Sequence, residues 1–214
     1  VWHLGNDIVD LADPRHEGKS RDLRFLQRVL SDSELAEVRE SWNPDQALWI
    51  RWAGKEAAFK TISKSLGAPP VFVHSHFRVI LHGAAANTLD PHGLHTPVTR
   101  FGQVHFQGIH LPLRIEVNGR LLHALTWAPH PRNNTPHFSW GAEEIREEAE
   151  GWRASLAAQF SPAEWDCITH RASALARLAA RRALAAALGI SQEELEVRCG
   201  PGSPGRRIPR VFAG

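Results

Sequence analysis

The stretch Trp52-Ala-Gly-Lys55-Glu56-Ala-Ala-Phe-Lys60 decides the fold of the first half of this 214-residue chain. Apolar residues recur through it at helical spacing, which predicts a helix that begins after Pro44 and ends at Gly67. Glu56 and Lys60 are four residues apart and share one face of that helix. The sequence therefore predicts a long helix with charged side chains beside its apolar stripe.

On spacing alone, the pair Glu56 and Lys60 has two interpretations. An ordinary ion pair on a solvated helix face stabilises the helix by about 0.2–0.5 kcal/mol and needs no function. Alternatively, Glu56 meets an acid from another element. Asp7 and Asp10 lie near the end of a short buried strand predicted over residues 3–11. Carboxylates that converge in this way suit Mg²⁺, which takes one or two of them.

The rest of the first half predicts further helices and an antiparallel sheet. Ser31-Asp-Ser-Glu34 has the pattern of a capping box, which opens a helix. Residues 71–127 alternate between apolar and polar side chains, and Asn118-Gly119 is typical of a hairpin turn. The predicted fold class is therefore α+β.

The second half repeats the order of the first. Residues 129–137 are rich in proline and asparagine and are predicted to link a first unit, 1–128, to a second, 138–214. The second unit contains a capping-box pattern at Ser161–Glu164, then an Ala-rich helix at Ala172–Leu188, then a strand. We expect two related α+β units packed as a pseudo-dimer, the second incomplete at its C-terminal end.

The composition limits the class of protein. With 43% hydrophobic residues the chain can bury a core, and it has no run of roughly 20 apolar residues that would span a membrane. Two cysteines form no metal-ligand spacing, which favours a cytoplasmic protein. The arginine-rich second half suggests an anionic ligand, but a net charge of +2 argues against nucleic acid.

Two motifs together resemble a known family. Gly5-Asn-Asp7-Ile-Val-Asp10 on the strand and Trp52–Lys60 on the helix, with Arg24–Leu35 between them, resemble the signature of the 4′-phosphopantetheinyl transferase superfamily, which includes holo-acyl-carrier-protein synthases. The resemblance covers about residues 3 to 67. It implies an enzyme that transfers the 4′-phosphopantetheine group of coenzyme A to a serine of an acyl or peptidyl carrier protein and releases 3′,5′-ADP, for example in fatty acid biosynthesis.

The resemblance also implies roles for individual residues. Asp7 and Glu56 would bind Mg²⁺, and the third metal ligand would be water or Asp10. Glu56, directly or through a metal-bound water, would act as the catalytic base, and Lys60 would contact phosphate or the departing group. The exposed charge for docking an acidic carrier protein would come from arginines on the first helices, with candidates Arg24, Arg28 and Arg39.

The cations that would bind coenzyme A are expected mainly in the second half. By resemblance, they come from a helix with arginines and from the loop Gly205–Pro209, because the guanidinium group donates to two phosphate oxygens at once. An alternative for each arginine is a place on a solvated helix face. The candidate residues for binding coenzyme A are Lys55, Lys60, Arg177, Arg181, Arg206 and Arg207.

Two features leave alternatives open. The family's second half bears a Ser-His pair on a strand, and the comparable Ile115–Asn118 has none, so a catalytically inactive homologue that binds carrier protein or coenzyme A is the alternative function. His74-Ser-His76 would place two imidazoles on one face of a strand and suggests zinc, but no third ligand follows at a recognised spacing.

Overall fold

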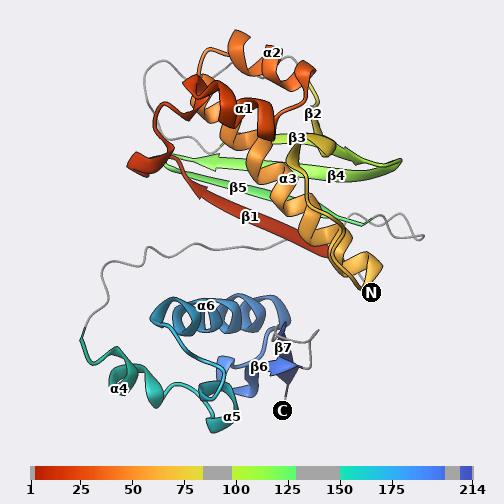
Figure 1. Cartoon of the computed structure of the whole chain (residues 1–214). Coiled ribbons are helices and arrows are strands. Elements are labelled where there is room, and N and C mark those ends of the chain that lie inside the picture. The colour runs from red at the N-terminus through yellow and green to blue at the C-terminus, as the bar shows by residue number, and fades with distance from the viewer. Residues whose placement is uncertain (1–2, 84–97, 129–149, 201–207, 214) are drawn as a thin grey trace. The chain divides into compact units, whose positions relative to one another are not determined.

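The computed structural model describes residues 3–83, 98–128, 150–200 and 208–213. The chain divides into two compact units, Val1–Asn134 and Thr135–Gly214 (Figure 1). This division falls inside the predicted linker, whose residues lie outside the described ranges. Each unit contains both helices and antiparallel strands, which confirms the α+β class. The packing of the units as a pseudo-dimer stays a prediction.

The first unit is a sheet with helices on one face (Figure 1). Within the described residues its strands lie in the order β1-β5-β4-β3-β2, and every neighbouring pair is antiparallel. The strands are β1 (Leu4–Asp10), β2 (Arg78–Leu81), β3 (Val98–Phe106), β4 (Ile109–Asn118) and β5 (Leu121–Trp127). The helices are α1 (Leu23–Val29), α2 (Asp32–Glu40) and α3 (Pro44–Leu66), with the 3₁₀ turns η1 (Pro14–His16), η2 (Lys19–Arg21) and η3 (His74–His76).

Helix α3 is the central element of this unit, and its predicted bounds are confirmed. The side chain of Asn43 accepts a hydrogen bond from the Gln46 amide at its start, and Gly67 takes the left-handed conformation at its end, with φ of 70°. Strand β1 approaches α3 so closely that a Cβ on Gly5 would lie 2.0 Å from the Ala57 carbonyl oxygen. Glycine is therefore required at this position of the motif.

The carboxylate of Glu34 joins three elements of the first unit. It is fully buried, and it closes the predicted capping box with Ser31 at the start of α2. Its Oε2 accepts a hydrogen bond from Lys55 Nζ at 2.6 Å, and its Oε1 accepts one from the Val79 amide of β2 at 2.8 Å. Lys55 also donates to the Val29 carbonyl at 2.8 Å. A buried ion pair therefore connects α2, α3 and β2.

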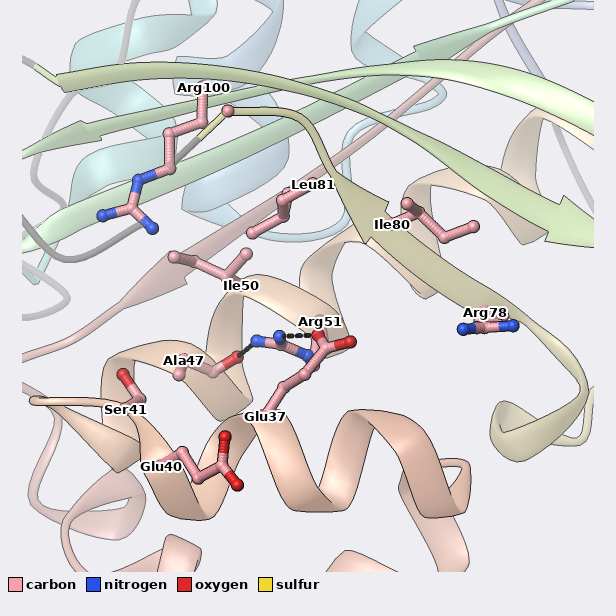
Figure 2. Close-up of a pocket in the computed structure, with 11 residues that line it drawn as sticks. Glu37, Glu40, Ser41, Ala47, Ile50, Arg51, Arg78, Ile80, Leu81 and Arg100 are labelled. Carbon is pink, nitrogen blue, oxygen red and sulfur yellow. Dashed lines mark hydrogen bonds and ion pairs between the residues drawn. The ribbon is translucent and has the colours of Figure 1, made fainter. Parts of the chain in front are cut away.

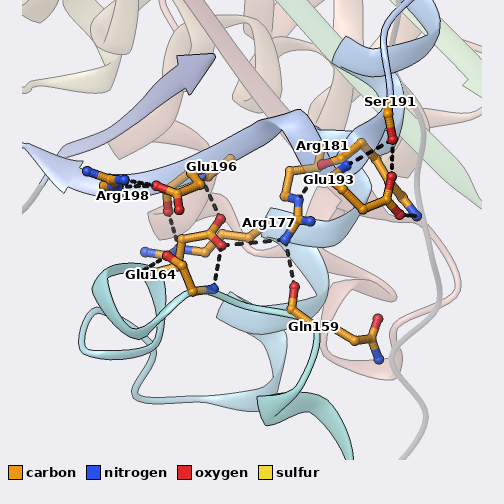
Figure 3. A network of polar contacts seen from close by, with 11 residues as sticks. Gln159, Glu164, Arg177, Arg181, Ser191, Glu193, Glu196 and Arg198 are labelled. Carbon is orange, nitrogen blue, oxygen red and sulfur yellow. Dashed lines mark hydrogen bonds and ion pairs between the residues drawn. The ribbon is translucent and has the colours of Figure 1, made fainter. Parts of the chain in front are cut away.

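The second unit repeats this arrangement with a different cation. Glu164 closes the predicted capping box with Ser161 and is 1% exposed. Its Oε1 accepts a hydrogen bond from the Val197 amide at 2.6 Å, and its Oε2 lies 3.5 Å from an Arg181 nitrogen (Figure 3). The elements are α4 (Trp152–Ala157), α5 (Pro162–Trp165), α6 (Arg171–Leu188), η5 (Gln192–Glu194), β6 (Leu195–Gly200) and β7 (Ile208–Ala213). The repeated contact supports the predicted duplication.

Replacing Lys55 by methionine is expected to lower the free energy of unfolding by about 3–5 kcal/mol, because the substitution leaves the buried Glu34 carboxylate without its cation. Urea denaturation followed by circular dichroism measures this. The matched control is Arg15→Met, which removes the exposed cation of the Arg15–Asp13 pair and should leave the midpoint unchanged. Equal effects of the two substitutions would show that the Lys55 pair does not hold the unit together.

Candidate active site

The structure brings Asp7, Glu56 and Lys60 to one place between β1 and α3. Lys60 Nζ donates hydrogen bonds to Asp7 Oδ1 at 2.7 Å and to the Asn6 carbonyl at 2.8 Å. The side chain of Asp7 is 19% exposed and that of Glu56 is 21% exposed. The site is therefore partly shielded from water but open to a ligand.

Burial is the main reason that the pKa of Asp7 lies above its ordinary value. The hydrogen bond and charge of Lys60 oppose this shift, and the negative charge of Glu56 adds to it. The two carboxylates therefore repel each other across the site, and a bound cation would reverse that repulsion.

The alternation of side chains along β1 sorts the residues of the strand motif. Gly5, Asp7 and Val9 share one face: Gly5 lies against α3 and Val9 is in the core. Asp10 lies on the opposite face, where Arg120 Nε donates to it at 3.1 Å. That contact holds the pKa of the Asp10 carboxyl below its ordinary value. Asp10 therefore does not lie with Asp7 and Glu56. Of the two candidates for the third metal ligand, Asp10 and water, water remains.

Glu56 has a partner that the sequence analysis did not identify. His74 Nε2 lies 3.2 Å from Glu56 Oε1, and the imidazole stacks on Trp52. His74 and His76 belong to the 3₁₀ turn η3 and not to a strand, so the argument that placed both on one strand face was wrong. Among the residues that the structure describes, no group of three or more His, Cys, Asp and Glu side chains is arranged to hold a metal.

The chemistry of Asp7 and Glu56 nevertheless fits Mg²⁺. Both offer carboxylate oxygens, they come from different elements, and each side chain is about four-fifths buried. Magnesium binds one or two carboxylates and takes its remaining ligands from water and substrate phosphate. A protein site with three or more ligands is not needed for such an ion.

Three residues predicted to bind coenzyme A are instead held inside the protein. Lys55 is fully buried against Glu34, which corrects the expectation that it contacts a ligand. Arg177 is 7% exposed and donates to the Val197 carbonyl at 3.1 Å. Arg181 is 8% exposed and its guanidinium donates to the carbonyls of Gln192 and Gln159 (Figure 3).

These arginines therefore stabilise the second unit, and neither is a solvated cation available to phosphate. Arg206 and Arg207 lie outside the described residues. The residues of the first helices proposed for docking, Arg24, Arg28 and Arg39, are all exposed.

A pocket of about 370 Å³ between α2, α3 and β2 holds another group of cations (Figure 2). Arg51, Arg78 and Arg100 line it together with Glu37. Arg51 is 6% exposed and bonds Glu37 and the Ala47 carbonyl, yet the Nε atoms of Arg51 and Arg100 have no hydrogen-bond partner among the described residues.

Burial and the charge of Arg51 lower the pKa of Arg100. Glu37 pairs with Arg51, but Arg78 and Arg100 also line the pocket, so an anion there would lower the repulsion between the guanidinium groups.

Comparison with known proteins identifies relatives of the first unit. The sequence model of the 4′-phosphopantetheinyl transferase superfamily matches residues 3–113. Holo-[acyl-carrier-protein] synthase of Shewanella frigidimarina is 35% identical over 81 residues, which are 38% of this chain and 64% of that protein. The enzyme of the same name from Nitrosomonas eutropha is 35% identical over 72 residues, which are 34% of this chain and 58% of that protein.

The crystal structure of holo-[acyl-carrier-protein] synthase from Neisseria meningitidis aligns with a TM-score of 0.43 and 20% identity, covering 60% of this chain and 98% of that one. The chain thus spans only part of the first two relatives, about three-fifths of their length. The matched segment nevertheless makes up about half of this chain and contains Asp7, Glu56 and Lys60. The chain belongs to the 4′-phosphopantetheinyl transferase superfamily.

Proposed function

We propose that this protein transfers the 4′-phosphopantetheine group of coenzyme A to a serine of an acyl or peptidyl carrier protein. The observation that carries the proposal is the meeting of Asp7, Glu56 and Lys60 between β1 and α3, in a chain of this superfamily. Two carboxylates and an ammonium group are the side chains that a phosphoryl-transfer site needs. The relatives are holo-[acyl-carrier-protein] synthases by name, which agrees with this reaction.

Asp7 and Glu56 would hold Mg²⁺, which, when bound, offsets negative charge on the phosphate oxygens of the substrate. The carrier serine oxygen forms a bond to the β-phosphorus, and the bond from that phosphorus to the oxygen of 3′,5′-ADP breaks. The serine proton passes to Glu56, whose Oε1 already contacts His74, so Oε2 is the oxygen available to accept it.

Lys60 would also contact the phosphate of the bound substrate. In this structure its ammonium group donates to Asp7 and to the Asn6 carbonyl, and its side chain is 42% exposed. An exposed ammonium on a flexible stem can turn to a phosphate oxygen and stabilise charge on the departing nucleotide.

The partners and the location are part of the same proposal. An acidic carrier protein would dock on the exposed arginines of α1 and α2 through weak, salt-dependent contacts. The pocket lined by Arg51, Arg78 and Arg100, called here the arginine pocket, is a candidate site for an anionic group of either substrate. Of the helices that the structure describes, none combines the length and apolar character needed to cross a bilayer. We propose a cytoplasmic location.

A catalytically inactive homologue remains the alternative function. In β4, the strand compared with the Ser-His strand of the family, Arg114 pairs with Glu116. No such Ser-His pair lies on that strand. The hydrogen bond of Lys60 to Asp7, with Glu56 close enough to affect the charge of Asp7, favours the active enzyme.

Glu56→Gln is expected to lower the transfer rate by about 10²-fold or more, because it removes both a metal ligand and the base while keeping the shape of the side chain. The measurement is the mass gain of an apo carrier protein incubated with coenzyme A, Mg²⁺ and the full chain. Glu17→Gln, an exposed side chain outside the candidate active site and the arginine-lined pocket, serves as the control and should retain the wild-type rate. Turnover of the Glu56 variant at the wild-type rate would remove Glu56 from the mechanism.

Asp7→Asn is expected to change how stability depends on pH. Because the folded-state pKa of Asp7 is raised, the native protein binds more protons than the unfolded chain between the two pKa values. Wild type should therefore gain stability relative to Asp7→Asn as the pH falls from 7 towards 4. Thermal unfolding of both proteins without divalent ions tests this, and a pH-independent difference would contradict it.

Mg²⁺ with coenzyme A should raise the melting temperature of wild type by mass action and leave Asp7→Asn nearly unchanged. The reference for each protein is its melting temperature with coenzyme A in a buffer free of divalent ions. An equal Mg²⁺-dependent shift in both proteins would place the ion elsewhere.

A further inference from the structure

His74 is the one described histidine seen to contact a candidate catalytic carboxylate. It lies in η3, immediately before β2, and its Nε2 is 3.2 Å from Glu56 Oε1. An ionised carboxylate has only acceptors, so the imidazole must donate, and Nε2 carries the hydrogen. The side chains of His74 and Glu56 are 20% and 21% exposed, so water competes only weakly for this bond.

Aromatic contacts fix the orientation of the imidazole. The Trp52 ring is stacked against it, with centroids 4.4 Å apart and an interplanar angle of 27°. The Phe72 ring lies against it at 4.2 Å and 43°. Trp52 stacks in turn on Phe25, and Phe72 stacks on Phe59. These contacts hold the plane of the His74 ring, and the hydrogen bond to Glu56 Oε1 selects the orientation in which Nε2 faces the carboxylate.

We propose that His74 is a positioning residue: it holds Oε1 of Glu56 by a hydrogen bond and so presents Oε2 to the metal ion and to the serine proton. The proposal rests on the proposed function of Glu56. Hydrogen bonds to a ligating carboxylate fix its orientation, and their loss commonly weakens metal binding by about 10–100-fold. Nothing in the sequence motifs predicts this role, because it depends on a turn 18 residues beyond Glu56.

Two substitutions separate the hydrogen bond from the stacking. His74→Phe keeps a ring between Trp52 and Phe72 but removes the donor. His74→Gln removes the ring but keeps an N–H near the position of Nε2. His76→Phe is the matched control, since His76 belongs to the same turn and is exposed.

The first readout is the affinity of the full chain for Mn²⁺ in the presence of coenzyme A, measured as free Mn²⁺ by electron paramagnetic resonance. We expect His74→Phe to weaken binding by about 10–100-fold, with His74→Gln and His76→Phe within about 3-fold of wild type. The transfer rate should likewise fall in His74→Phe and stay near that of wild type in His74→Gln and His76→Phe. Wild-type Mn²⁺ affinity in a folded His74→Phe protein, checked by near-ultraviolet circular dichroism, overturns the proposal.

The second readout does not depend on metal or activity. Long-range ¹H–¹⁵N spectra of the metal-free chain should show His74 with its hydrogen on Nε2, and Glu56→Ala should shift that signal while leaving His76 in place. Hydrogen on Nδ1, or no response to Glu56→Ala, overturns the pairing whatever the enzyme does. If the signature is present but wild type binds no Mn²⁺ with coenzyme A, the proposed function fails and the pairing of His74 with Glu56 stands.

Discussion

The buried carboxylate of Glu34 is the constraint on which the first unit depends. Its two oxygens bind the Lys55 ammonium of α3 and the Val79 amide of β2, so three elements meet at one charge. Removing either ion would leave the other uncompensated in the core, which is costly. Because Lys55 must point at Glu34, the rotation of α3 is set, and the next residue, Glu56, is turned towards the edge where Lys60 meets β1.

The second unit also contains a buried glutamate bonded to a cation and to a strand amide, and this explains why its arginines do not serve as solvated cations. Glu164 occupies the place of Glu34 and receives the Val197 amide and an Arg181 nitrogen. Arg177 of α6 donates to the Val197 carbonyl of β6. In a unit with a small core, guanidinium groups can satisfy several carbonyls at once, so arginine suits an internal structural role as well as a phosphate-binding one.

In the candidate active site, two carboxylates lie near each other on elements that the core holds in place. Asp7 stays partly buried although the negative charge of Glu56 disfavours its ionised form; Lys60 donates to Asp7, and His74 lies beside Glu56. The pocket lined by Arg51, Arg78 and Arg100 has a weaker, opposite imbalance: Glu37 pairs with Arg51, while burial and the charge of Arg51 lower the pKa of Arg100. Sites that keep such imbalances in the folded chain are the places where a charged ligand gains most by binding.

The sequence by itself determined the elements and the motif residues. Helix α3 is visible because Asn43, Pro44 and Gly67 are local signals, and the capping boxes depend on residues three apart. Only the tertiary structure decided which charged side chains face inward. From the sequence, Lys55, Arg177 and Arg181 are candidates for binding coenzyme A. Helical spacing gives the direction of a side chain around the axis, but it does not show which other element lies in that direction. The partners that bury them come from other elements, as does His74 beside Glu56.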